Sequence, residues 1–297
     1  MKRLAVGVAL VFVIQVLGSA VPLTLLYTND LHARLERFDG LAERIAAERS
    51  TGTPILLLDA GDAWQDFRVP MLAVWGAAET VAWMNEVGYD AMALGNHELY
   101  LGAEVLAERA AQAGFPLLCA NLRPCPGVDP PFAPFVVRQV GDLRVLLIGL
   151  VTDDGLPYPD YPWLAYESPG RALLRTLKAA STGADLTIAL VHLSLSEAAR
   201  LAEAVPGVDV FVTGHSHQTT AQPIRVGESL VVQAGDFGRF LGRLRLDVDP
   251  ATGAVRVVDN ALLETRSAPA NIGQGVVRFL ALASILAGLF ALVAQKL

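Results

Sequence analysis

Cysteine is scarce in this sequence, and its placement excludes a thiolate metal site. Only two cysteines occur in 297 residues, Cys119 and Cys125, and their spacing matches no zinc-binding pattern. In an exported protein the pair could close a small-loop disulfide. The alternative is one buried strand thiol and one loop thiol, and the sequence does not decide between the two states.

Basic residues are also few in relation to acidic ones. The chain has 23 Lys and Arg against 30 Asp and Glu, which gives a net charge of −7. Every acid lies in the middle of the chain, whereas four bases lie in the terminal segments: Lys2, Arg3, Arg278 and Lys296. The acidic middle repels a nucleic-acid backbone, so we expect a small substrate and no nucleic-acid duplex as a partner. An anionic substrate would have to be held locally, for example by metal ions.

The first 20 residues have the pattern of a signal peptide. Lys2 and Arg3 precede an apolar run over 4–17, and small residues close the segment at 18–20. No cysteine follows these small residues, which argues against a lipoprotein. We expect cleavage after Ala20, with an uncleaved anchor as the alternative, and therefore an exported protein.

A second apolar segment lies near the other end of the chain. Residues 279–294 carry no charge, and the run is apolar on every face of a helix. We expect a transmembrane anchor over 276–294 after a linker at 266–275, with Arg278 and Lys296 at its two ends. The alternative is an amphipathic helix packed on the domain.

Strand-like and helical segments alternate along the middle of the chain, with no internal repeat. A hairpin is predicted at 135–140 and 145–151, and strands without helices follow at 230–233, 241–248 and 254–258. This order predicts a single α/β domain over 21–265 with its helices on the outside. The alternating part has strands at 23–27, 55–58, 91–94, 117–120, 186–191 and 210–213, and helices at 38–50, 77–87, 101–113, 171–180 and 196–205.

All five histidines follow predicted strands in polar or glycine-containing turns. In an α/β sheet such positions lie at the carboxyl ends of strands, where sites form. Residues i and i+2 of an extended chain point to the same side, so Asp30 and His32 could reach one metal ion. The other candidates are Asp62, Asn96, His97, His192, His215 and His217.

Carboxylate, imidazole and amide ligands without thiolates suit zinc, manganese or iron. Seven candidate ligands from five loops are too many for one tetrahedral ion, and they suit two divalent ions that share a bridging carboxylate. Two such ions could bind a phosphate, activate a water molecule and stabilise charge during an in-line displacement.

Together these motifs resemble the signature of the calcineurin-like metallophosphoesterases, and flanking residues resemble the catalytic domain of the 5′-nucleotidase family. The resemblance covers about residues 23–263. The signature is Asp30-Leu31-His32, Gly61-Asp62, Gly95-Asn96-His97-Glu98, His192 and Gly214-His215-Ser216-His217, and the flanking residues include Leu58-Asp59-Ala60-Gly61-Asp62, Ala120-Asn121-Leu122, Thr152-Asp153-Asp154 and Gln233-Ala234-Gly235.

The resemblance implies a four-layer α-β-β-α sandwich and a role for each candidate residue. It implies that His97 stabilises the transition state or protonates the leaving group, beside the ligand Asn96. It also implies two metal ions, one on Asp30, His32, Asp62 and His217 and the other on Asp62, Asn96, His192 and His215.

Two departures from the family pattern limit what is carried over. Nucleotidases of this family have an Asp three residues after the catalytic His, whereas this chain has Tyr100. A tyrosine hydroxyl can hydrogen-bond an imidazole but supplies no carboxylate charge. The family's nucleotidases also carry a C-terminal domain that binds base and ribose, which we do not expect in this sequence.

The sequence therefore predicts a two-metal phosphoester hydrolase acting outside the cytoplasm on nucleotides or other small phosphomonoesters or diesters. One alternative is a relative of the thiosulfohydrolases of sulfur oxidation, against which the retained His97 argues. The other is a non-catalytic metal-binding surface protein, which Tyr100 favours. The substrate, the metal and the oligomeric state are not determined by the sequence.

Overall fold

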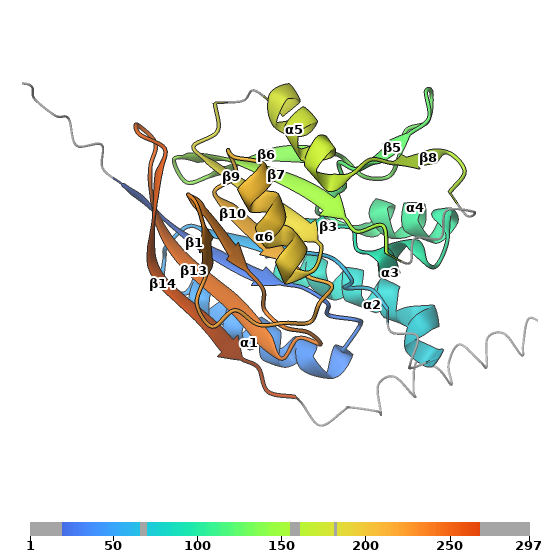
Figure 1. Cartoon of the computed structure of the whole chain (residues 1–297). Helices are drawn as coiled ribbons and strands as arrows, with labels where there is room; N and C mark the ends of the chain where they lie inside the picture. The colour runs from blue at the N-terminus through green and yellow to red at the C-terminus, as the bar shows by residue number, and fades with distance from the viewer. Residues whose placement is uncertain (1–19, 66–69, 155–160, 181–182, 268–297) are drawn as a thin grey trace, which may run out of the picture.

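The computed structural model describes residues 20–65, 70–154, 161–180 and 183–267 (Figure 1). The signal peptide expected at 1–20, apart from residue 20, and the anchor expected at 276–294 lie outside these residues. Within them, no helix has the length and apolar character that crossing a membrane requires.

The first of two large sheets has six strands in the order β14-β13-β1-β2-β3-β4. Its strands β1 to β4 run parallel, whereas β13 and β14 form an antiparallel extension beside β1. The strands are β1 (Val21–Thr28), β2 (Ile55–Asp59), β3 (Ala91–Ala93), β4 (Leu117–Leu118), β13 (Phe240–Asp249) and β14 (Ala254–Glu264).

The second sheet also has six strands, in the order β11-β12-β10-β9-β7-β6. Strands β7, β9, β10 and β12 are parallel, and the hairpin partner β6 and the edge strand β11 are antiparallel to their neighbours. The strands are β6 (Phe135–Val140), β7 (Leu143–Val151), β9 (Leu186–His192), β10 (Val210–Thr213), β11 (Ile224–Val226) and β12 (Ser229–Val232).

The two sheets pack against each other, and each is covered by helices on its other face (Figure 1). Because side chains alternate along a strand, Leu56 and Leu58 enter the core between the sheets while Leu57 packs under the helices. Helices α1 (Phe38–Arg49), α2 (Pro70–Val87) and α4 (Ala103–Gln112) cover the first sheet, and α5 (Pro169–Ala180) and α6 (Leu195–Ala204) cover the second. The predicted four-layer α/β sandwich is confirmed.

The structure differs from the sequence prediction in short elements and in the lengths of α2, which begins at Pro70, and β14, which ends at Glu264. The helix predicted at 101–113 begins at Ala103, and a separate turn of helix, α3 (Asn96–Leu99), precedes it. The structure also contains β5 (Leu122–Pro124), which pairs with β8 (Leu164–Tyr166). These two strands and the short helix η1 (Leu35–Arg37) are too brief for periodicity to reveal.

The two cysteines are free thiols and do not form the disulfide that the sequence left open. Cys119 is buried and Cys125 is exposed, and both are free. Burial raises the pKa of the Cys119 thiol to about 12, so this sulfur is inert at neutral pH.

Candidate metal centre

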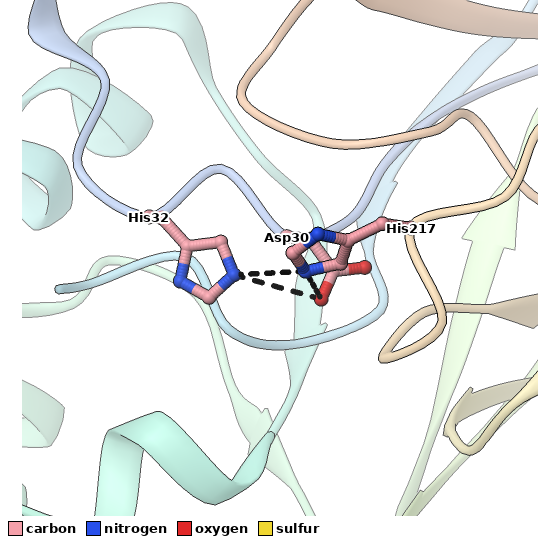
Figure 2. A group of neighbouring side chains, drawn as sticks. All are labelled: Asp30, His32 and His217. Atoms are coloured by element: carbon pink, nitrogen blue, oxygen red, sulfur yellow. Dashed lines mark hydrogen bonds and ion pairs between the residues drawn. The ribbon is translucent and has the colours of Figure 1, made fainter. Parts of the chain in front are cut away.

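Three of the predicted ligands meet where strand β1 ends. The Nε2 atom of His32 lies 3.2 Å from Nε2 of His217 and 3.8 Å from Oδ1 of Asp30. Figure 2 shows the two imidazoles pointing toward each other beside the Asp30 carboxylate. His217 follows β10 in the second sheet, so this cluster joins the carboxyl ends of one strand from each sheet.

Asp62 is the centre of two further clusters. It forms one with His32 and His97 and another with His192 and His215, and within each cluster the potential ligand atoms lie within 4.8 Å of one another. Its Oδ2 atom is 3.1 Å from Nε2 of His192 and 3.8 Å from Nε2 of His97. A single buried carboxylate therefore faces the side chains that could hold two neighbouring ions.

The histidine ring nitrogens have the orientation that cation binding requires. Nδ1 of His32 donates to the carbonyl oxygen of Gln65, and Nδ1 of His192 donates to that of Ala60, each at 2.9 Å. Each ring consequently directs its Nε2 atom, the nitrogen left for a metal ion, toward a carboxylate. Imidazole nitrogens and carboxylate oxygens that converge this closely are the donors that divalent metal ions take once the imidazoles are deprotonated, so the residues fit such ions.

Asn96 is the predicted ligand with an amide side chain. Its Nδ2 donates to the Tyr100 hydroxyl at 2.6 Å, which fixes the orientation of the amide. Its Oδ1 is buried and has no hydrogen-bond partner. A buried acceptor without a partner is costly, and a metal ion would satisfy it.

His97 differs from the buried histidines His32 and His192 in exposure and contacts. Its backbone N–H donates to Oδ1 of Asp62 at 2.8 Å, and its carbonyl accepts from Nε2 of Gln65 at 2.5 Å. Its side chain is 22% exposed, whereas that of His192 is fully buried. The Tyr100 ring lies 4.9 Å from the His97 ring. His97 thus lies at the solvent side of the clusters, with its imidazole accessible.

Most of the candidate ligands have a backbone conformation that non-glycine residues rarely adopt. A positive φ for such residues is strained and marks functional sites more often than ordinary loops. The surrounding hydrogen bonds hold the turns in place, for example from the N–H of Asp30 to the carbonyl of Gly61 at 2.9 Å. The affected candidates are Asp30 (φ 50°), His32 (φ 49°), Asp62 (φ 58°), His215 (φ 67°) and His217 (φ 55°).

Glu98 ties two of the ligand loops together. Its buried carboxylate accepts four backbone N–H groups, from Gly95, Asp62, Ala63 and Trp64, at 2.7 to 3.1 Å. Burial and the nearby Asp62 charge raise the pKa of Glu98 to about 7. The sequence placed Glu98 in a motif but gave it no role, because its four partners lie in two loops that only the fold brings together.

The charges around Asp62 determine its protonation state. Burial alone would raise the pKa of Asp62, but His192, His97 and His32 reverse this and hold it below its usual value. For His192 burial acts against protonation, yet the Asp62 carboxylate raises its pKa to about 10. His32 has a lowered pKa, chiefly through burial. An anionic Asp62 and a neutral His32 are the forms that bind metal ions.

Asp236 is a contacting residue that sequence reasoning missed. Its Oδ2 lies 3.2 Å from Nδ1 of His217, and its Oδ1 accepts from Arg239. It directly follows the noted Gln233-Ala234-Gly235 motif, which was the available signal. Asp154, noted in a motif without a role, lies 3.4 Å from Nε2 of His215.

Comparison with known families gives one match that covers most of the domain. The model described as "Calcineurin-like phosphoesterase" matches residues 23–219. The match spans the region from the first strand to the His215 turn and includes every candidate site residue.

Known proteins similar to this chain are 5′-nucleotidases. A snake venom 5′-nucleotidase of Gloydius brevicauda is 32% identical over 292 residues, with 84% of this chain and 49% of the relative covered. A human 5′-nucleotidase is 31% identical over 290 residues, covering 83% and 50%. This chain spans about half the length of these relatives.

A solved structure shows the same architecture. The crystal structure of a 5′-nucleotidase precursor from Thermus thermophilus superimposes with a TM-score of 0.72 at 28% identity. The superposition covers 90% of this chain and 59% of that one.

Proposed function

The chain belongs to the calcineurin-like phosphoesterase family, and from this premise we propose a two-metal phosphoester hydrolase that acts on nucleotides or other small phosphomonoesters or diesters. Family and nucleotidase relatives support a metal-dependent phosphoester hydrolase in general. The observation that carries the proposal is the convergence of three ligand clusters, two of them centred on Asp62.

The proposed ligands divide into two sets around the shared Asp62 carboxylate. Asp30, His32 and His217 would complete the first set, and Asn96, His192 and His215 would complete the second. Two divalent ions bound there would supply charge to bind the phosphoryl oxygens and to activate a water molecule. Zinc, manganese and iron all suit this mixture of nitrogen and oxygen donors.

His97 is proposed as the residue that acts on the leaving group. Its accessible imidazole lies beside Asp62, and the hydrogen bond from its backbone N–H to Asp62 holds the main chain at this residue. From that position it would donate a proton to the departing oxygen or stabilise the charge that develops on the phosphoryl group. Asn96, one residue before it, would orient the same phosphoryl group.

We also propose that the protein is exported and anchored in the cell membrane. The basic start and apolar run of residues 1–20 and the uncharged run at 279–294 support this location. The venom origin of one relative agrees with export. Protease accessibility of the chain in intact cells would test it, and a chain found only in the soluble cytosolic fraction would contradict it.

Hydrolysis is tested with the purified full chain supplied with zinc, manganese, cobalt or iron. We expect turnover of p-nitrophenyl phosphate and of a panel of nucleotides, and a more than roughly hundredfold loss in Asp62→Ala. His97→Gln should keep its metals and lose turnover, which separates an enzyme from a metal-binding surface protein. Asp142→Ala is the matched control, because this exposed carboxylate precedes the first residue of β7, at the end of the strand opposite the proposed site.

Two results would contradict the proposal. One is the absence of hydrolysis with all four metals, and the other is unchanged hydrolysis in Asp62→Ala. A thiosulfonate tested beside the phosphoesters distinguishes sulfur–sulfur hydrolysis, and faster turnover of that compound would favour the alternative substrate class.

A further inference from the structure

Asp236 is a buried carboxylate that the proposed reaction leaves without a role. It lies in the loop after β12 and is 7% exposed. One of its oxygens is 3.2 Å from Nδ1 of His217, and the other accepts from the Arg239 guanidinium. Asp236 belongs to none of the three ligand clusters among the described residues, and it contacts the metal centre at His217.

The loop that carries Asp236 is fixed against the end of β1. The Asn29 side chain accepts from the N–H of Ala234 at 2.9 Å and donates to the carbonyl of Gly235 at 2.6 Å. One residue beyond Asp236, the N–H of Phe237 donates to the carbonyl of Asp30 at 2.7 Å. The position of the Asp236 carboxylate is therefore set relative to Asp30, which lies in the same cluster as His217.

His217 needs such support more than the other two imidazoles whose Nδ1 partners are known. Its side chain is 35% exposed, against 3% for His32 and none for His192, so packing restrains it least. His32 and His192 are oriented by backbone carbonyls, whereas the Nδ1 of His217 faces a charged carboxylate.

A carboxylate at Nδ1 has a defined effect on the other ring nitrogen. It holds the proton on Nδ1 and leaves the lone pair on Nε2, which here lies 3.4 Å from Oδ1 of Asp30. It also makes Nε2 a stronger donor to a cation than a neutral partner would.

We propose that Asp236, held by Arg239, is a positioning residue that fixes His217 for binding a divalent cation in the Asp30–His32–His217 cluster. The inference rests on the proposed function, since it presupposes that this cluster holds an ion. It adds a residue outside the ligand set that controls affinity for one of the two ions.

The test is calorimetric titration of Mn²⁺ into the metal-stripped full chain. In Asp236→Ala we expect one of two binding events to weaken by about 10- to 100-fold. Asp236→Asn should weaken it less, because the amide oxygen keeps the acceptor for Nδ1. Asp259→Ala is the control, since this carboxylate also pairs with an arginine, Arg243, at 2.5 Å, but in β14. Its Mn²⁺ affinities should match those of the wild type.

The outcomes separate this inference from the proposed function. Wild type that binds two ions and hydrolyses phosphoesters, with unchanged affinities in both Asp236 variants, would overturn the inference alone. A lower unfolding temperature in these variants, with no change in Mn²⁺ affinity, would also overturn the inference alone. Wild type that binds no Mn²⁺ would overturn both. If Asp236→Ala does not fold, Asp236→Asn and Arg239→Ala decide, with a weakened event expected in each.

Discussion

Tyr100 orients the amide side chain of Asn96. Its hydroxyl accepts from Nδ2 of Asn96 at 2.6 Å, which leaves Oδ1 directed away from Tyr100 and without a partner. The family pattern places a carboxylate at this position to orient the catalytic histidine. In this chain the Tyr100 hydroxyl holds Asn96, the residue before His97, and the Tyr100 ring lies beside the His97 ring.

Tyr100→Phe should weaken catalysis without disturbing the fold. Loss of one hydrogen bond of about 1 kcal/mol frees the Asn96 amide to rotate and should lower kcat/KM by roughly fivefold. Tyr161→Phe is the control, since it loses a buried hydroxyl contact at 2.9 Å to the carbonyl of Leu99, which is not a proposed ligand. Steady-state kinetics of both variants decide, and equal losses would contradict the role of Tyr100.

Asp59 is a second residue whose environment determines its chemistry. Burial raises its pKa well above the usual value, although Thr28 and the N–H of Gly61 hydrogen-bond to its oxygens. The folded state therefore binds a proton that the unfolded state releases above about pH 4. Between those two pKa values, stability falls as pH rises.

Asp59→Asn should remove this dependence on pH. The amide keeps an oxygen for the Gly61 N–H and never ionises, so the free energy of unfolding should vary less between about pH 4 and 8 than in the wild type. Urea unfolding of both proteins across this range measures the difference. A variant with the same slope against pH would show that Asp59 is ionised in the folded protein.

Among the elements, the turns after the parallel strands require close contact between backbones. Gly95 precedes α3 and lies against the Asp62 turn, and a Cβ atom at residue 95 would collide with the Asp62 side chain and backbone. The Gly95 N–H also donates to Glu98 at 2.7 Å. This contact brings the end of β3 to the end of β2, and it brings Asn96 to Asp62.

Gly95→Ala should separate these two turns. We expect a loss of about 1–3 kcal/mol in stability from overpacking, together with weaker metal binding and lower activity. Gly170→Ala in α5 is the control, because its Cβ would meet only Leu201 at ordinary contact distance, 3.8 Å. That variant should be as stable as the wild type or slightly more stable. Thermal unfolding and metal titration of the pair test this, and equal behaviour would refute the packing argument.

In the whole molecule, the proposed metal centre joins the two sheets. Asp30, Asp62 and Asn96 follow strands of the first sheet, whereas His192 and the His215 turn end strands of the second. The carboxyl ends of parallel strands from both sheets meet at the proposed metal centre, which is where sites in α/β proteins generally form. Ions bound there would link the sheets and stabilise the folded state.

Removal of metal should consequently lower thermal stability as well as activity. At a free metal concentration about 100 times Kd, binding contributes about 2.7 kcal/mol, or roughly 5 to 10 °C in Tm. We expect a chelator to lower Tm by this amount and to abolish hydrolysis, and we expect added metal to reverse both effects. Asp62→Ala should show a smaller change in Tm on chelation. A Tm that does not respond to chelator in the wild type would contradict ligation across the sheets.

The sequence by itself determined the elements and the residue types of the site. Apolar runs and helical spacing are local properties, so the strands that precede Asp30, Asp62 and His215 were predicted within a few residues. The order of strands and helices was sufficient for an α/β class, and the spacing of the histidines was sufficient to propose a shared metal centre. The resemblance to a known family supplied the four layers.

Only the tertiary structure decided which side chains support that centre. Asp236 beside His217, Glu98 on four backbone amides and Tyr100 on Asn96 are found from distances, and the free thiols likewise required the fold. Asp236 and His217 are far apart along the chain, and the backbone amides that Glu98 binds lie in two different loops. The physical reason is that hydrogen bonds depend on positions within about 3 Å, which local sequence patterns do not encode.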